Sequence, residues 1–121
     1  MRVVAGRYGG RSLTAPKGDH ARPTGDRVKE SLFAILRDET VDANVLDLYA
    51  GSGALGIEAL SRGARRVDFV DRHTRSIAAI RANVRSLGVP ADAARITKAT
   101  AGAFLRRAAS GDDGYDLVFL D

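Results

Sequence analysis

The sequence predicts an α/β fold, with a mostly parallel sheet covered by helices on both faces. Two observations predict it. Between residues 45 and 120, short apolar segments alternate with segments of helical periodicity, in the order β-α-β-α-β-α-β. A glycine-rich turn, GSGALG, follows the first apolar segment. The 121 residues suffice for one domain with a modest core, and the 45% hydrophobic content is ordinary for a globular protein.

The first 24 residues differ from the rest of the chain in their glycines and charge. Residues 3–4 and 12–15 flank Gly6, Gly9 and Gly10 and predict a small β-hairpin. Residues 16–25 are rich in Pro, Gly and charge and predict a loop. We therefore expect residues 1–24 to form a basic hairpin and loop, and residues 25–121 to form the α/β core.

A helix is expected over residues 26–38. Thr24 suits its N-cap, and Asp26 suits the positive end of its dipole. Helical spacing predicts an apolar face made of Val28, Leu32 and Ile35 or Leu36.

The alternating part supplies four strands and three further helices. Strands are expected at residues 45–49, 66–70, 94–98 and 115–120. Helices are expected at residues 54–62, 74–87 and 100–109, with a turn at 111–114. Gly63 and Gly88 would end the first two of these helices, and Pro90 strengthens the second stop signal.

The last strand, YDLVFLD, reaches the final residue, Asp121. A half-sheet of four parallel strands would leave an exposed apolar edge, which proteins avoid. We therefore expect the core to be truncated after its fourth strand, and the sequence to be the N-terminal portion of a longer protein.

The glycine-rich turn fits the pattern G-x-G-x-x-G with Gly51, Gly53 and Gly56. Asp71 follows Gly51 by 20 residues, where a dinucleotide-binding fold places its ribose-binding acid. Because the turn lies between a strand and a helix, a ligand would bind there, at the carboxyl ends of the strands. The alternative is a glycine-rich turn that binds nothing.

Asp47 favours S-adenosylmethionine over NAD as the ligand of the turn. It lies four residues before Gly51, and a carboxylate directed at the turn would repel the pyrophosphate of NAD. The same carboxylate suits a cation, such as the ammonium or sulfonium group of S-adenosylmethionine. Asp71 does not discriminate, because both cofactors carry a ribose.

The net charge of +4 is located in the N-terminal quarter of the chain. Residues 1–30 hold seven basic and three acidic residues, and the other 91 residues hold 12 of each sign. Basic arms of this kind often contact nucleic acid phosphates. A solvated, flexible tail is the alternative.

Several function classes are excluded by composition. The chain has no cysteine, so it has no disulfide, Cys-based zinc site, iron–sulfur cluster or thiolate nucleophile. Its two histidines lack ligand spacing, and no metal is expected. No apolar run approaches the ~18 residues of a membrane span, and the N-terminus lacks a signal-peptide pattern, so we expect a cytoplasmic protein without membrane contact.

The segment DLYAGSGALGIEA resembles motif I of the class I S-adenosylmethionine-dependent methyltransferases, which have a Rossmann-like fold. Within these, the chain is most similar to the bacterial 16S rRNA guanine-N2 methyltransferases, the RsmD family. The resemblance covers nearly the whole chain. It includes RVVAGRYGGRSL at the start, RPTGDRVKESLF at 22–33, VDFVDR, ANVRSLG at 82–88 and YDLVFLD. The 22–33 match is the most specific to the family.

The resemblance implies a set of residues that bind S-adenosylmethionine: Asp47, Gly51, Ser52, Gly53, Asp71, Arg72, Thr100 and Ala101. In it, Asp47 lies near the amino-acid end of the cofactor, Asp71 binds the ribose and Arg72 flanks the adenosine. The family usually has an acidic residue after the third strand, whereas this chain reads KATAGAF at 98–104. Thr100 or the backbone amide of Ala101 would therefore contact the adenine.

The resemblance also implies an active-site mouth formed by Arg22, Thr24, Asp26 and Arg27, although helix capping by Thr24 and Asp26 is the plainer interpretation. Asn83 matches the family too, but we expect an exposed polar residue on a helix. Asp121 would be the catalytic residue, the first of an Asp/Asn-Pro-Pro-aromatic motif. Its carboxylate would accept a hydrogen bond from the exocyclic amine of the target base and align the nitrogen for methyl transfer. The 121 residues alone are expected to transfer no methyl group.

The expected partner is 16S rRNA, within an assembled or assembling 30S subunit, and a monomer is expected. The hairpin would contact RNA through Arg2, Arg7, Arg11 and Lys17. A DNA adenine-N6 methyltransferase, an NAD-dependent oxidoreductase and a non-enzymatic RNA-binding domain are the alternatives.

Overall fold

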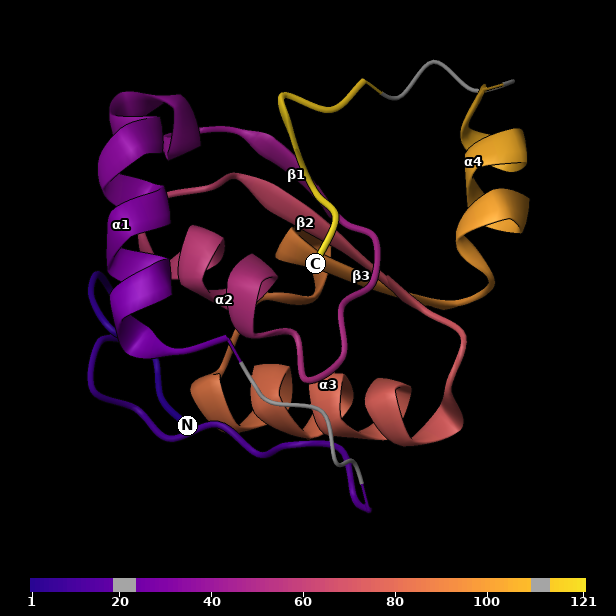
Figure 1. Ribbon diagram of the computed structural model, residues 1–121, viewed down its shortest axis with the longest axis horizontal. Helices are drawn as coiled ribbons and strands as arrows, with labels where there is room; N and C mark the ends of the chain where they lie inside the picture. Colours follow the sequence, from indigo (N-terminus) through magenta and orange to yellow (C-terminus); the bar gives the residue numbers. More distant parts are fainter. Residues whose placement is uncertain (19–23, 110–113) are drawn as a thin grey trace.

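The computed structural model describes residues 1–18, 24–109 and 114–121 and confirms the α/β fold. Four parallel strands form one sheet in the order β3-β2-β1-β4. The elements in chain order are α1 (Asp26–Leu36), β1 (Asn44–Asp47), α2 (Ala54–Ser61), β2 (Arg66–Asp71), α3 (Thr74–Leu87), β3 (Ala94–Lys98), α4 (Ala101–Ala109) and β4 (Leu117–Phe119). Short 3-10 turns at Arg37–Thr40 and Ala91–Ala93 follow α1 and α3. Figure 1 shows α1 and α4 at opposite sides of the sheet.

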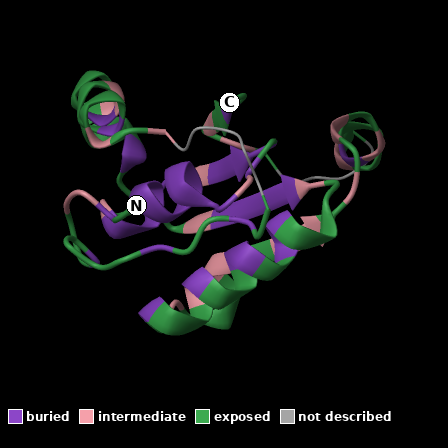
Figure 2. Ribbon diagram, turned by 60° about the horizontal axis from the view of Figure 1, so that its bottom comes forward, coloured by how far each residue is buried: buried purple, intermediate pink, exposed green. Residues whose placement is uncertain are grey.

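Helices cover both faces of the sheet. Neighbouring residues of a strand point to opposite faces, and in β1 and β2 apolar residues point to both. Val45, Val67 and Phe69 enter a core cluster that also contains apolar residues of α1, α2 and α3. Leu46 and Val70 enter a second cluster, with Phe104 of α4. Figure 2 shows β1 and β2 almost continuously buried between the helices.

Residues 2–13 turn back on themselves as the predicted hairpin does, with one isolated bridge in place of two regular strands. Arg2 and Ser12 make an antiparallel bridge, and the backbone N–H of Val3 donates to the carbonyl of Arg11 at 2.9 Å. Val3, Tyr8 and Leu13 are buried in the core cluster that contains α2 and α3. The alternative of a solvated tail is therefore wrong for the described residues up to 18.

Helix α1 begins as predicted, but its buried face is shifted by one residue, with Leu32 and Leu36 of the predicted face only partly buried against the core. Its N-cap is Gly25, which has no side chain, and Thr24 makes no cap hydrogen bond. Val28 and Ile35 are 58% and 78% exposed. Lys29 and Phe33 are buried instead, the same helical spacing shifted by one residue. Phe33 packs edge to face against Phe119 of β4, with ring centroids 5.8 Å apart.

The other boundaries lie close to the predicted ones. Helix α3 and strand β3 have the predicted bounds, and β1 and β4 are shorter than predicted. Gly88 ends α3 in the left-handed conformation, with φ +71°. Residues 111–113 of the predicted turn lie outside the described residues.

Strand β4 is at one edge of the sheet, where Val118 and Leu120 are 49% and 70% exposed. The predicted apolar edge is therefore present. None of the helices in the described parts of the chain is long and apolar enough to cross a membrane.

Candidate active site

The glycine-rich turn lies at the carboxyl end of β1 and leads into α2, and we call residues 50–56 the glycine loop. Gly51 and Gly53 have φ values of +59° and +84°, a region in which residues with side chains are strained. A Cβ atom added at Gly51 would have no neighbour within 4 Å, so this side of the loop is open. At Gly56, a Cβ atom would lie 2.4 Å from Cε1 of Phe69. Gly56 is therefore needed for the packing of α2 on β2.

The carboxylate of Asp47 lies beneath this loop. The backbone N–H of Gly56 donates to its Oδ2 at 3.0 Å, and the residue is 1% exposed. Burial raises the pKa of Asp47 to about 7, and the nearby carboxylates of Asp121 and Asp71 act in the same direction. The hydrogen bond from Gly56 lowers the pKa. Asp47 is thus directed at the loop, as predicted, and holds its junction with α2.

Asp71 connects the loop to the end of β2. Its Oδ2 accepts a hydrogen bond from the N–H of Gly51 at 3.0 Å, and its Oδ1 accepts one from the N–H of His73 at 2.9 Å. An ionised carboxylate has about four lone-pair sites, so acceptor capacity is left for a ribose hydroxyl.

A cavity of about 330 Å³ opens beside Asp71. Four of the predicted cofactor residues line it: Asp71, Arg72, Thr100 and Ala101. Leu48 and the half-exposed Tyr49 add apolar and aromatic surface. This size and lining fit a nucleoside group of a cofactor. Within the described lining no acidic residue follows β3, and Thr100 Oγ1 accepts from the N–H of Ala103 as a cap of α4.

Asp121 lies just after β4, next to the glycine loop. Strand β4 pairs in parallel with β1, and Phe119 lies opposite Asp47. The carboxyl ends of the two strands therefore lie side by side at one edge of the sheet. The hydroxyl of Thr24 donates to Oδ2 of Asp121 at 2.6 Å. The structure therefore brings one predicted mouth residue onto the predicted catalytic residue, over a sequence separation of 97 residues. Capping of α1 by Thr24, the plainer interpretation, is wrong because the hydroxyl is directed to Asp121.

The other residues of the predicted mouth are arranged differently. Asp26 pairs with Arg2 at 2.9 Å, and the hydrogen bond from that guanidinium lowers the pKa of Asp26. Arg27 is exposed and makes no ion pair with the described residues. Arg22 lies outside the described residues.

The residues predicted to bind RNA are exposed, but they do not form one cluster of free cations. The Arg2 guanidinium is paired with Asp26, and Arg11 donates to the carbonyl of Ser86 at 2.9 Å. Lys17 is exposed. Arg7 lines a second cavity of about 580 Å³ with Arg62, Arg65, Asp42 and Asp92. This cavity lies at the end of the sheet where β2 begins, whereas Asp71 ends β2.

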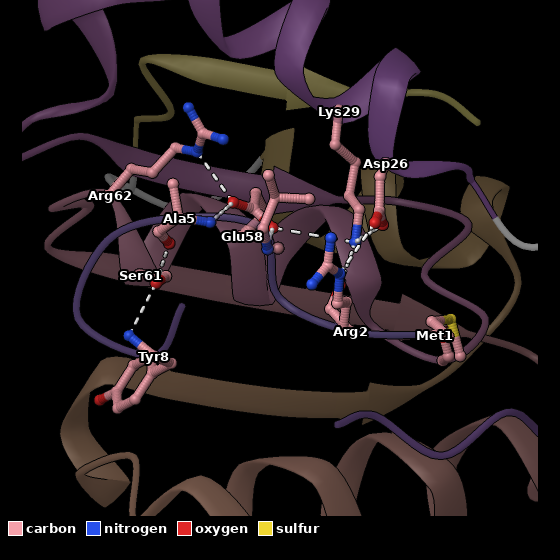
Figure 3. A network of polar contacts seen from close by, with 12 residues as sticks. Met1, Arg2, Ala5, Tyr8, Asp26, Lys29, Glu58, Ser61 and Arg62 are labelled. Carbon is pink, nitrogen blue, oxygen red and sulfur yellow. Dashed lines mark hydrogen bonds and ion pairs between the residues drawn. The ribbon is translucent and has the colours of Figure 1, made fainter. Parts of the chain in front are cut away.

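A buried polar network attaches the hairpin to α1 and α2 (Figure 3). Glu58 of α2 is fully buried, and its carboxylate accepts from the backbone N–H groups of Val4 and Ala5 and from Arg62. Lys29 of α1 is also fully buried. Its Nζ donates to the carbonyl of Arg2 at 2.5 Å and lies 3.8 Å from Glu58. The start of α1 at Asp26 is thereby fixed against the hairpin, and Thr24 lies two residues before it.

The expectation that Asn83 is exposed is wrong, since the residue is 2% exposed. Its side chain bonds to the backbone of Thr14 and to the carbonyl of Ser52 in the glycine loop. Helical spacing could have indicated this, because Asn83 lies three residues after Ile80 and four before Leu87, both buried.

Comparisons with known proteins find relatives that match the whole chain. The family model described as "Conserved hypothetical protein 95" matches residues 1–121. Ribosomal RNA small subunit methyltransferase D of Haemophilus influenzae is 36% identical over 121 residues, which are 100% of this chain and 62% of the relative. The protein of the same name from Escherichia coli is 38% identical over 121 residues, 100% of this chain and 59% of the relative.

A solved structure shares the fold of this chain. A hypothetical protein of Thermus thermophilus superposes with a TM-score of 0.87 and 30% identity, over 98% of this chain and 67% of that chain. The chain spans about three fifths of the length of the two curated relatives above.

Proposed function

This chain belongs to the family described as "Conserved hypothetical protein 95", the RsmD family that its motifs resemble, and from that premise we propose that it forms the cofactor-binding part of an rRNA methyltransferase. The proposed reaction moves a methyl group from S-adenosylmethionine to the exocyclic N2 amine of a guanine in 16S rRNA. One observation carries the proposal: Asp47, Asp71 and Asp121 stand at the carboxyl ends of three adjacent strands, beside the glycine loop.

The residues at this edge suit the parts of the cofactor. Asp71, Arg72, Thr100 and Ala101 would hold the adenosine in the cavity that they line. Asp47 and the glycine loop, with Gly51, Ser52 and Gly53, would hold the amino-acid end. When bound, S-adenosylmethionine supplies a methyl group activated by a sulfonium centre.

Asp121 is proposed to orient the target amine. Thr24 already donates to Oδ2 of Asp121, which fixes the carboxylate. Oδ1 makes no hydrogen bond to the described residues and would accept one from the N2 amine of guanine. Orientation of this kind can supply several kcal/mol of rate enhancement without a strong base.

The proposed substrate is 16S rRNA within an assembled or assembling 30S subunit, with the protein acting as a cytoplasmic monomer. The names of the relatives support an rRNA substrate. A target base must leave its stack to reach Asp121, and exposed loop bases allow this most readily.

Calorimetry on this chain tests the cofactor. S-adenosylhomocysteine is expected to bind, and an Asp71→Ala variant is expected to bind it more weakly. Arg106→Ala, on the exposed surface of α4, is the control and should bind normally. Tight NAD binding instead would support an oxidoreductase and contradict the cation preference that we assign to Asp47.

Methyl transfer is tested in the full-length protein with labelled S-adenosylmethionine. We expect label in the N2 position of guanine when 30S subunits are supplied, and a kcat at least about a hundredfold lower for Asp121→Ala. Label in adenine of duplex DNA would favour the DNA methyltransferase. RNA binding without any cofactor binding would favour a non-enzymatic domain.

A further inference from the structure

Asn83 joins two parts of the molecule that are far apart in sequence. We call residues 1–15 the N-terminal segment. The Oδ1 atom of Asn83 accepts from the backbone N–H of Thr14 at 2.7 Å. Its Nδ2 donates to the carbonyl of Thr14 and to the carbonyl of Ser52, both at 2.9 Å. One buried carboxamide therefore bonds the N-terminal segment and the glycine loop at the same time.

The contact fixes one peptide group of the glycine loop from both sides. The carbonyl of Ser52 and the N–H of Gly53 belong to the same planar peptide unit. Asn83 holds the carbonyl, and the carbonyl of Ala50 accepts from the N–H of Gly53 at 2.7 Å. Because Gly51 and Gly53 on either side have no side chains to restrict them, the loop depends on such contacts for its conformation.

A carboxamide is required for this arrangement. An aspartate could accept from Thr14 but could not donate to Ser52, and a leucine could do neither. The two bonds to Thr14 in turn fix the rotamer of Asn83. Ser61 provides a comparison, since it is buried and holds the same segment, through the N–H of Tyr8 and the carbonyl of Ala5. No hydrogen bond among the described residues links Ser61 to the glycine loop.

We propose that Asn83 is a positioning residue for the cofactor: locked by Thr14, it holds the peptide of Ser52 and Gly53 in the conformation that binds S-adenosylmethionine. The cofactor part rests on the proposed function. Binding at the loop and docking of residue 14 are then coupled, and by linkage each strengthens the other equally.

The first experiment needs no ligand. Amide hydrogen exchange is measured for Gly51 and Gly53 in the wild type, in Asn83→Leu and in Ser61→Ala. We expect faster exchange of the Gly53 amide in Asn83→Leu only. Equal exchange in all three proteins, or equal acceleration in both variants, would overturn the positioning role.

The second experiment measures affinity for S-adenosylhomocysteine by calorimetry. Asn83→Leu is expected to bind about tenfold more weakly, the loss of roughly one hydrogen bond. Ser61→Ala should lose thermal stability but keep wild-type affinity. Wild-type affinity in folded Asn83→Leu, or equal weakening in both variants, would contradict the coupling. No binding by the wild type would count against the proposed function alone, since the exchange result does not depend on it.

Should Asn83→Leu fail to fold, the wild type still decides the coupling. The amide of Thr14 is expected to become more protected from exchange when S-adenosylhomocysteine binds, and the amide of Tyr8, held by Ser61, should not change. Unchanged protection of Thr14 in the bound protein would overturn the coupling.

Discussion

Asp47 illustrates how one buried side chain can make stability depend on pH. In the unfolded chain an aspartate has a pKa of about 3.9. In the folded chain, burial raises the pKa of Asp47 to about 7. The folded state therefore binds more protons than the unfolded state between these values, and the contribution of Asp47 to stability falls as pH rises from about 4 to about 7.

The prediction is that Asp47→Asn removes this dependence. The new carboxamide would keep an oxygen that can accept from the N–H of Gly56. The free energy of unfolding of the variant, minus that of the wild type, should increase with pH by up to about 1.4 kcal/mol per pH unit and level off above about pH 7. Urea unfolding at several pH values between about 4 and 8 measures the difference. A difference that is constant over this range would show that Asp47 stays ionised in the folded chain.

At the same scale, residues with long-range partners were the hardest to predict. Sequence patterns placed Asp71 directly after a strand and Asp47 within one, just before the glycine-rich turn, since these positions depend only on local alternation. The partner of Thr24 is 97 residues away, and that of Asn83 at Thr14 is 69 residues away. No local pattern encodes such contacts. Local patterns alone predict exposure for Asn83, and for Thr24 they suggest only helix capping, whereas its place at the active-site mouth comes from the family resemblance.

At the scale of elements, the packing of α2 on β2 depends on Gly56. We predict that Gly56→Ala lowers the free energy of unfolding by about 1–3 kcal/mol, because the added Cβ would lie 2.4 Å from Cε1 of Phe69 and 2.8 Å from Cγ1 of Val67. Phe69 is fully buried and has little room to move. Chemical denaturation provides the measurement.

Gly102→Ala in α4 is the matched control. The nearest atom to its added Cβ is Nη1 of Arg106, at 3.5 Å. We expect the free energy of unfolding to rise by about 0.5–1 kcal/mol, as for alanine in place of glycine within a helix. A comparable loss in both variants would indicate a general intolerance of helical alanine rather than close packing at Gly56.

The second prediction at this scale concerns the attachment of α1 to α2. Glu58→Ala removes the acceptor of two backbone N–H groups and leaves the buried ammonium group of Lys29 with only the half-exposed carboxylate of Asp26, 4.0 Å away. We expect the free energy of unfolding to fall by about 3–5 kcal/mol. Lys29→Met should cost less, because Glu58 keeps Arg62 and both N–H groups. Urea unfolding of the single and double variants tests this, and additive losses would show that the two residues do not interact.

The face of α1 also shows why element boundaries were easier to predict than packing. Helix α3 has the predicted bounds and ends at Gly88, where the glycine signal places its end. In α1, however, Lys29 occupies the buried face, where a sequence pattern assigns an apolar residue. The buried carboxylate of Glu58, 3.8 Å from Nζ, explains this choice, and it lies in another helix.

At the scale of the whole molecule, the two cavities lie at opposite ends of the sheet. Strand β2 has six residues and separates Arg65, which lines one cavity, from Asp71, which lines the other. At about 3.3 Å per residue the separation is roughly 20 Å. RNA that contacts both Arg7 and Asp121 must therefore follow the surface from one end of the sheet to the other.

This arrangement gives a prediction for RNA binding. Replacement of Arg7 and Arg11 by Glu should weaken binding to a 16S rRNA fragment and reduce the slope of log K against log salt by about one per lost phosphate contact. Affinity for S-adenosylhomocysteine should not change, because neither residue lines the cofactor cavity. Filter binding between about 50 and 200 mM salt measures the slope.

Arg106→Glu with Lys98→Glu makes the same change in net charge and is the control. Helix α4, which carries Arg106, packs on the opposite face of the sheet from the hairpin. If the control lowers RNA affinity as much as the hairpin variant, net charge rather than the hairpin attracts the RNA. If the hairpin variant also loses cofactor affinity, the hairpin has a structural role.

The docking of residues 1–15 has a consequence for the order in which a nascent chain can fold. These residues leave the ribosome before α2 and α3, and their partners Glu58, Ser61 and Asn83 follow 53 to 69 residues later. Until α2 and α3 have been synthesised, Val3, Tyr8 and Leu13 have no core to enter. A segment that is made early thus reaches its native place only after α2 and α3 have been made.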